Sequence, residues 1–329
     1  MMIALGAGAV ASTVRPRLAM AAPPKGKVIR LGLLTGIRDK FDPESNAIDR
    51  AITESLRAQG YEIGRNVALE FRSAGGNPER LPALAAELAR LKVDMFVTLG
   101  TQPTLTAFRA AQAIPIIAVG ITDPVETNLA QSLARPGGNV TGLAVNASDI
   151  SAKRVQLLKE AVPKFSRVAV LWNSTFQSMS LQFQQVETAA PTLGVTVLSL
   201  RVASADDFDH AFEAIRKGRP DGLIVLFGPM RGSDLPRIVE FVTHNRLPAL
   251  FELGQGIRGG GLMEFGADFA DLARQVGPYV DKIANGAKAA DLPIAQPTKF
   301  ELNINMKAAR AMGLTIPPSL LLRADKVVE

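Results

Sequence analysis

Short apolar runs alternate with amphipathic segments through the first half of the chain. The runs at 28–35, 93–99 and 114–119 are apolar almost throughout, as expected of parallel strands that are buried on both faces. Residues 66–73 alternate between apolar and polar side chains, which also predicts a strand. The segments between the strands have the spacing of amphipathic helices, as in Leu81, Leu84, Leu88 and Leu91. This order requires right-handed crossovers and predicts a parallel sheet.

The same order begins again after residue 149. The predicted strands of this half are 168–172, 195–200, 222–227 and 249–251. A helix at 206–217 has apolar residues at helical spacing, namely Phe208, Ala211, Phe212 and Ile215. Two successive runs of one α/β order without a sequence repeat predict two lobes of the same architecture rather than a solenoid.

The stretch from Ile121 to Val125 ends the fourth predicted strand. Asp123 is suited to cap a following helix, and Pro124 is suited to its first position. A Pro-Gly-Gly-Asn turn at 136–139 then leads into a short strand at 140–145. Ligands of open α/β sheets bind beyond the carboxyl ends of the strands, so this stretch is a candidate ligand-binding region.

Thr122-Asp-Pro-Val125, followed by Ser-Leu-Ala-Arg-Pro-Gly-Gly-Asn-Val-Thr-Gly at 132–142, resembles the hallmark of one family of ABC-transporter substrate-binding proteins. Members of that family are often described as tryptophan/tyrosine-type or as uncharacterised. Supporting matches are Gly-Thr-Gln-Pro at 100–103, Gln-Pro-Thr-Lys-Phe-Glu-Leu at 296–302 and Ile-Pro-Pro-Ser-Leu at 316–320. The resemblance spans residue 28 to the end, and the long middle motif is its specific part.

The resemblance implies the type I periplasmic binding protein fold, in which two Rossmann-like lobes with parallel sheets are joined by a three-strand hinge. We therefore expect an α/β protein whose first lobe is formed by residues 28–145 and 267–296. The second lobe is expected at 149–260 and 305–329. Hinge crossings are expected near 140–148, 261–266 and 298–304.

The same resemblance implies a small-molecule ligand, in particular an aromatic or other amino acid, and an ABC membrane permease as the partner. It implies no catalytic residues, and we expect a monomer. The absence of cysteine removes disulfides and thiolate chemistry, while His210 and His244, the two histidines, are predicted on surface helices and suggest no metal site. No Walker or G-x-G-x-x-G motif follows the first strand, so no nucleotide cofactor is expected. The chain contains no basic stripe with aromatics, which argues against nucleic acid.

The first 21 residues predict a signal peptide, and we expect its start to be truncated. Residues 1–14 are apolar but too short to span a bilayer, and Ala19-Met20-Ala21 forms a small-x-small cleavage site. Loss of Arg15 and Arg17 with this leader lowers the formal charge from +6 to +4. We expect a periplasmic protein whose mature chain begins near Ala22; the alternative is a cytoplasmic protein with an apolar leader.

Residues that follow the predicted strands form the candidate ligand-binding set. They are Phe41, Asp42, Thr101, Gln102, Thr122, Asp123, Asn146, Trp172, Asn173, Phe227, Phe251 and Glu252. Helix-start donors suit a carboxylate, carboxylates suit an ammonium group, and aromatic rings suit an apolar body.

In the most specific form of this hypothesis, Thr101 and the amides after it hold a ligand carboxylate. Asp123 holds the ammonium group with help from Gln102, while the aromatic residues Trp172, Phe227 and Phe251 cover the ligand side chain. Each residue also has a structural alternative. Thr101 and Asp123 are suited to cap helices, the aromatic residues are suited to core packing, and Glu252 is suited to a solvated position.

Two other functions fit the same fold. A regulatory effector domain would require a DNA-binding helix pair, and the segment before residue 28 is short and apolar. A doubly wound α/β enzyme would require a nucleophile, metal site or cofactor loop, and the sequence offers only carboxylates for such chemistry.

Overall fold

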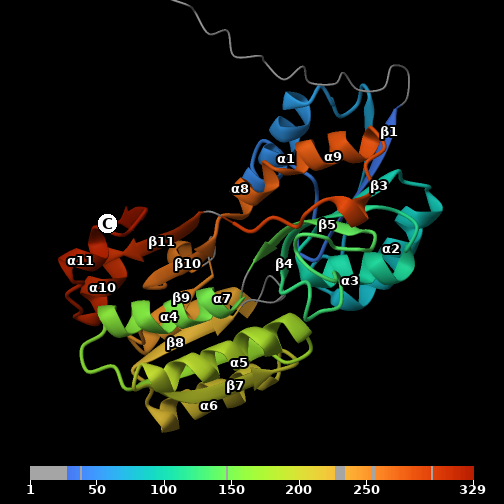
Figure 1. Cartoon of the computed structure of the whole chain (residues 1–329). Helices are drawn as coiled ribbons and strands as arrows, with labels where there is room; N and C mark the ends of the chain where they lie inside the picture. Colours follow the sequence, from blue (N-terminus) through green and yellow to red (C-terminus); the bar gives the residue numbers. More distant parts are fainter. Residues whose placement is uncertain (1–27, 38, 146, 227–233, 253–255, 298) are drawn as a thin grey trace, which may run out of the picture.

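Two separate β-sheets organise the chain, each covered by helices on both faces (Figure 1). This computed structural model describes residues 28–37, 39–145, 147–226, 234–252, 256–297 and 299–329. We call the first sheet with its helices the first lobe, and the second sheet with its helices the second lobe. Within the described ranges, every helix is too short or too polar to cross a membrane.

The first sheet has the strand order β2-β1-β3-β4-β5, and all its neighbouring strands are parallel. Its strands are β1 (Ile29–Thr35), β2 (Val67–Ser73), β3 (Met95–Leu99), β4 (Ile116–Thr122) and β5 (Val140–Val145). The crossover helices are α1 (Ala47–Ala58), α2 (Leu81–Arg90, after the 3-10 turn Pro78–Arg80) and α3 (Thr101–Ala110). Side chains of alternate strand positions enter two apolar clusters, one under α1 and the other under α2 and α3. Burial on both faces explains why β1, β3 and β4 are apolar almost throughout, whereas the edge strand β2 is only partly buried and contains Glu70 and Arg72.

The second sheet has the order β12-β11-β10-β9-β8-β6-β7, and only β10 and β11 are antiparallel neighbours. Its strands are β6 (Arg167–Asn173), β7 (Thr196–Val202), β8 (Gly222–Leu226), β9 (Ala249–Phe251), β10 (Met263–Ala267), β11 (Phe300–Asn305) and β12 (Lys326–Val328). The two parallel-dominated sheets confirm the predicted α/β fold class.

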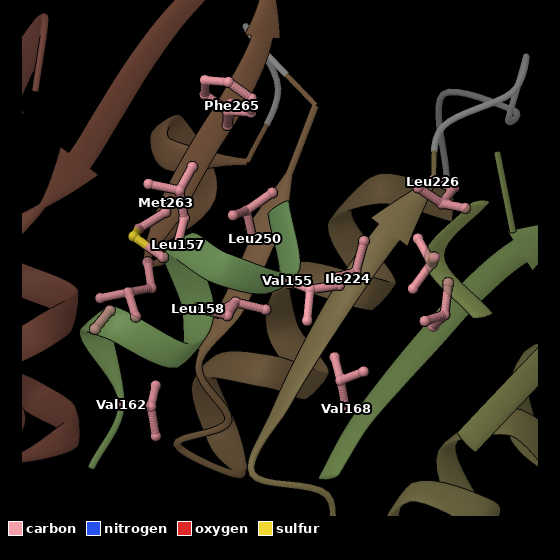
Figure 2. Close-up of a cluster of buried hydrophobic side chains, with 14 of the residues drawn as sticks. Val155, Leu157, Leu158, Val162, Val168, Ile224, Leu226, Leu250, Met263 and Phe265 are labelled. Atoms are coloured by element: carbon pink, nitrogen blue, oxygen red, sulfur yellow. The ribbon is translucent and has the colours of Figure 1, made fainter. Parts of the chain in front are cut away.

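Helices again cover both faces of this second sheet. They are α4 (Ala147–Ala161), α5 (Gln177–Thr192), α6 (Asp207–Gly218), α7 (Asp234–His244), α10 (Met306–Met312) and α11 (Pro318–Leu321). Figure 2 shows the core under α4, where Val155 lies beside Ile224 of β8 and Leu157 lies beside Met263 of β10. The opposite face packs against α6 and α7.

The chain passes between the two sheets three times. It leaves the first sheet after β5 and returns after β10, because α8 (Phe269–Ala273) packs against α1 and β4. It crosses again before β11, which lies in the second sheet. These passages lie next to the predicted crossings, while the limits of the lobes and the action of the passages as a hinge stay predictions.

Residues 269–284 form two helices, α8 and α9 (Val276–Ala284), rather than one. Pro278 has no N–H to donate to the carbonyl of Arg274, so the helical ladder is interrupted there. The hydroxyl of Ser55 from α1 donates to that carbonyl, and it accepts a bond from the N–H of Gly277 at 2.8 Å. A Cβ on Gly277 would lie 2.1 Å from the carbonyl oxygen of Ser55, so glycine is required where α1 meets α9.

Candidate functional site

The carboxyl ends of the strands in both sheets lie at the passages between the lobes. β5 ends at Val145 and leads directly into α4 of the second lobe. β10, which runs parallel to β9, ends at Ala267 and leads into α8 of the first lobe. The carboxyl edges of the two sheets are therefore directed toward each other, as Figure 1 shows. This geometry brings together the strand-end residues of the two lobes.

Thr101 and Thr122 are in direct contact at the carboxyl edge of the first sheet. The hydroxyl oxygen of Thr101 accepts a hydrogen bond from the backbone N–H of Thr122 at 2.9 Å, and both residues are buried. A hydroxyl that accepts one bond still has its own proton to donate. Gly100, with φ 89°, supplies the left-handed turn that joins β3 to α3 and places Thr101 in the first turn of the helix. Thr101 thus offers a donor beside the N-terminus of α3.

Asp123 does not begin a helix, contrary to the sequence prediction. Its φ is 41°, in the left-handed region, and the chain continues as turns. The carbonyl oxygen of Asp123 accepts bonds from both the N–H and the hydroxyl of Thr127 at 3.0 Å, which closes the first turn. The N–H groups of Leu129 and Ala130 then share the carbonyl of Pro124, so no helical ladder forms. Asp123 remains half-buried at the end of β4, directly after Thr122 of the Thr101–Thr122 contact.

Asp42 organises the loop between β1 and α1. Its carboxylate pairs with the ammonium group of Lys40 at 2.9 Å and accepts bonds from the N–H groups of Glu44 and Ser45 at 3.2 Å. The hydrogen bonds from Lys40 and Ser45 hold the pKa of Asp42 well below its usual range. Its own N–H donates to the Asp49 carboxylate.

The neighbouring candidates Phe41 and Gln102 are half-buried, as Asp42 is. Phe41 is half-buried, with its ring 6.3 Å from that of Phe71. Gln102 is half-buried in the first turn of α3, where its carbonyl accepts a bond from the Thr106 hydroxyl. Together with Asp42, these residues stand at the starts of α1 and α3, on the same edge of the sheet as Thr101.

Two of the aromatic candidates, Trp172 and Phe251, pack into the core of the second lobe. The ring of Trp172 stacks on Phe183 with centroids 4.7 Å apart, and its indole N–H donates to the Ser199 hydroxyl at 3.0 Å. Phe251 is fully buried, and its ring fills the space beside Gly256 and Gly261. These contacts account for the burial of both rings, while their role in ligand binding stays a prediction.

The remaining candidates of the second lobe are Asn173, Asn146 and Phe227. The side-chain oxygen of Asn173 accepts bonds from the N–H and the hydroxyl of Thr175, at 2.9 and 2.7 Å, and so stabilises the turn after β6. Asn146 and Phe227 lie outside the described residues. Nothing structural is therefore added to the prediction for these two positions.

A buried arginine that the sequence analysis did not single out lies at the same edge of the second lobe. Arg154 of α4 is 2% exposed; its guanidinium contacts the carboxylate of Glu252 at 3.1 Å and donates to the side-chain oxygen of Gln182 at 2.9 Å. Burial lowers the pKa of Arg154, and the charge of Glu252 opposes that shift. Arg154 falls at helical spacing from Ile150 and Leu158, on the apolar side of α4, and that spacing was the available signal.

The strand-end arrangement can hold a polar molecule. Among the described residues, no group of three or more histidine, cysteine, aspartate or glutamate side chains could hold a metal ion.

A cavity of about 620 Å³ opens at the opposite edge of the first sheet, between the amino ends of its strands and the end of α9. Asp94, Asn139 and Lys288 contribute its polar lining. This cavity is remote from the strand-end candidates.

Comparisons with known proteins connect this geometry to one class of protein. The family model described as "ABC transporter substrate binding protein" matches residues 42–328. A tyrosine-binding protein of Clostridioides difficile (strain R20291) is 24% identical over 272 residues, which is 83% of this chain and 78% of that protein.

Two solved structures are similar over almost their whole length. An ABC domain from Streptococcus pneumonia in complex with L-Trp has a TM-score of 0.83 and 25% identity, covering 91% of this chain and 99% of that one. The ligand-free, open structure of a substrate-binding protein with adhesive properties from Clostridium difficile has a TM-score of 0.67 and 23% identity, covering 92% and 99%.

Proposed function

Because the chain belongs to the ABC transporter substrate-binding protein family, we propose that it binds an aromatic amino acid between its lobes and delivers it to an ABC importer. Its fold is that of the type I periplasmic binding proteins. Proteins of this family bind small molecules and deliver them to ABC permeases. The observation that carries the proposal is the family match over residues 42–328, joined to relatives described as binding tyrosine and L-Trp.

The first lobe would hold the charged groups of the amino acid. The Thr101 hydroxyl and the N–H groups in the first turn of α3 favour a carboxylate, because the N-terminus of a helix carries unpaired donors and a positive partial charge. Asp123, half-buried at the end of β4, would pair with the ammonium group, with Gln102 assisting. The carboxylate and the ammonium group would thereby be fixed at neighbouring strand ends.

Binding would be coupled to closure of the two lobes. The liganded and the open relatives have nearly the same identity to this chain, yet their TM-scores are 0.83 and 0.67. Since identity and coverage are matched, the difference supports a family in which the lobes take more than one arrangement. A ligand shifts such an equilibrium by its greater affinity for one arrangement. The three passages between the lobes are the natural hinge.

The location we propose is the periplasm, after removal of a leader that ends near Ala21. Proteins of this family are generally exported, in keeping with the apolar leader and its small-x-small site. Expression from the genomic start, followed by fractionation and N-terminal sequencing, should give a processed chain that begins near Ala22. Unprocessed protein in the cytoplasm would contradict this location.

Calorimetric titration and thermal melting of the mature chain test the proposed ligand. L-Trp, L-Tyr and L-Phe are the candidates, while L-Leu, indole and D-Trp serve as controls for ring and charged groups. A ligand at one hundred times its Kd should stabilise the folded state by about 2.7 kcal/mol. Failure of all three candidates to bind, or turnover of any of them, would refute the proposal.

A further inference from the structure

Strand β4 contains an irregularity just before the Thr122–Asp123 strand end. Gly120 has φ 74°, and the pairing of β4 with β5 shifts register between Val119 and Ile121. The glycine therefore permits a left-handed kink that another residue would strain. The kink lies two residues before Thr122, in a buried part of β4 that α8 contacts.

The ring of Phe269 lies directly on that backbone. A Cβ on Gly120 would come within 2.2 Å of Cε1 and 2.8 Å of Cζ of Phe269. Phe269 is the first residue of α8, and its position is fixed by the preceding Asp268, whose carboxylate accepts bonds from the N–H groups of Ala270 and Asp271 at 2.8 and 3.3 Å. The ring is thus held in place from both sides, by the glycine below it and by the helix cap behind it.

Despite its contact with Gly120, Phe269 remains 37% exposed to solvent. Two further exposed apolar side chains, Ile37 after β1 and Val125 after β4, follow strands of the same sheet at the same carboxyl edge. If the ring served only to fill the space above Gly120, complete burial of its apolar surface would stabilise the fold further. Phe269 lies where the chain passes from β10 into α8, and its ring contacts β4, the strand that ends at Thr122.

We propose that Phe269 is the first lobe's contact for the aromatic ring of the ligand and that it selects ligands with a flat side chain. This inference rests on the proposed function. The polar strand ends at Thr101 and Asp123 would fix the charged groups of an amino acid, and the ring on Gly120 would offer its face to the side chain. Because Phe269 follows the passage out of β10, ligand contact there would also engage the segment that joins the two lobes.

The test compares F269A, F269L and F269Y with L322A, a control at a side chain that is 88% exposed in the second lobe. Affinity for L-Trp and L-Tyr is measured by calorimetry, with melting temperature recorded for each variant. F269L keeps apolar bulk without a ring and should bind about two- to tenfold more weakly, F269A at least tenfold more weakly, and F269Y within about threefold of wild type. L322A should bind as wild type does.

The outcomes separate this inference from the function on which it rests. Failure of the wild type to bind any aromatic amino acid would refute both. Wild-type binding that F269A and F269L retain within twofold would refute the role of Phe269 alone, and a lowered melting temperature with unchanged affinity would reduce Phe269 to a packing residue. If F269A does not fold, the affinity of F269L for the aromatic amino acids, compared with that of F269Y, tests the role of Phe269.

Discussion

Replacing Glu252 by glutamine tests whether this carboxylate neutralises a buried arginine or holds the ligand. Glu252 was predicted as a ligand-binding residue, and its carboxylate contacts the Arg154 guanidinium at 3.1 Å. Glu252→Gln removes the negative charge while retaining an oxygen that can accept a hydrogen bond. The guanidinium, which is 2% exposed, would then be left with neutral acceptors on Gln182, Phe265 and the new glutamine.

The expected loss of unfolding free energy follows from the burial of the two partners. Removing one partner of a fully buried ion pair costs about 3–5 kcal/mol. The Glu252 side chain is 25% exposed, so water partly screens this pair, and glutamine retains one acceptor. We therefore expect a loss of about 2 kcal/mol. Arg154→Met in the Glu252→Gln background removes the uncompensated charge and should recover at least about 1 kcal/mol of that loss.

Urea unfolding at neutral pH measures these differences. Glu160→Gln is the matched control, because Glu160 is 29% exposed but pairs with Arg323, which is 41% exposed. An exposed pair of this kind contributes about 0–1 kcal/mol. Glu252→Gln within 0.5 kcal/mol of wild type, or strictly additive effects in the double variant, would refute the reasoning. Weaker ligand binding with unchanged stability would instead support Glu252 as a ligand contact.

Other perturbations test separate features of the structure. Asp123→Asn, which suits the left-handed backbone, should weaken amino-acid binding about ten- to a hundredfold in calorimetry without lowering the melting temperature; the reverse result would make Asp123 purely structural. Burial and a hydrogen bond to Asp281 raise the pKa of Tyr61 to about 12. The contribution of the protonated Tyr61 to the free energy of unfolding is therefore fully present below the unfolded pKa of about 10, and it is lost as the pH rises toward 12. Between pH 9 and 11 the wild type should lose about 1.3 kcal/mol more than Tyr61→Phe in urea unfolding, and equal losses would contradict the shift. Gly277→Ala should cost about 3 kcal/mol in urea unfolding, because its Cβ would overlap the backbone of α1; Gly138→Ala, whose Cβ meets no atom within 4 Å, should cost far less. A saturating ligand should reduce the radius of gyration in X-ray scattering, whereas an unchanged radius with tight binding would argue against closure.

The order of strands and helices could be predicted because burial on both faces makes the inner parallel strands almost continuously apolar, while the edge strand β2 alternates between apolar and polar residues. The pairing of strands that are distant in the sequence could not be predicted. The antiparallel contact of β10 with β11 joins segments separated by the whole of α8 and α9, and no local pattern marks it. The break at Pro278 was visible as a proline, but the Ser55 hydroxyl that stabilises it belongs to a helix more than two hundred residues earlier.

The sequence predicted where the candidate site lies, at the strand ends, but not the backbone conformation and contacts of its residues. Strand ends follow from strand limits, so Thr101 and Thr122 could be expected at one edge, and their hydrogen bond agrees with that. The backbone of Asp123 could not be foreseen, since Asp-Pro is equally suited to a helix start and to a turn. Phe269 gave no signal of its own, because its placement depends on the kink at Gly120 in another part of the chain. Arg154 looked like an ordinary charged residue of an exposed helix.

The contact between Ser55 and Gly277 also sets an order on how the molecule can be made. The two residues are 222 positions apart, and the whole second lobe up to β10 is synthesised between them. At about 5–20 residues per second, the first lobe must wait roughly 10–45 s for α8 and α9 to emerge from the ribosome. The free edge of β5 remains unpaired for longer, because the residue that pairs with it, Ala295, is synthesised after α9. During that interval the apolar face of α1 and an unpaired strand edge remain open, so the nascent first lobe is exposed to aggregation unless a chaperone protects it.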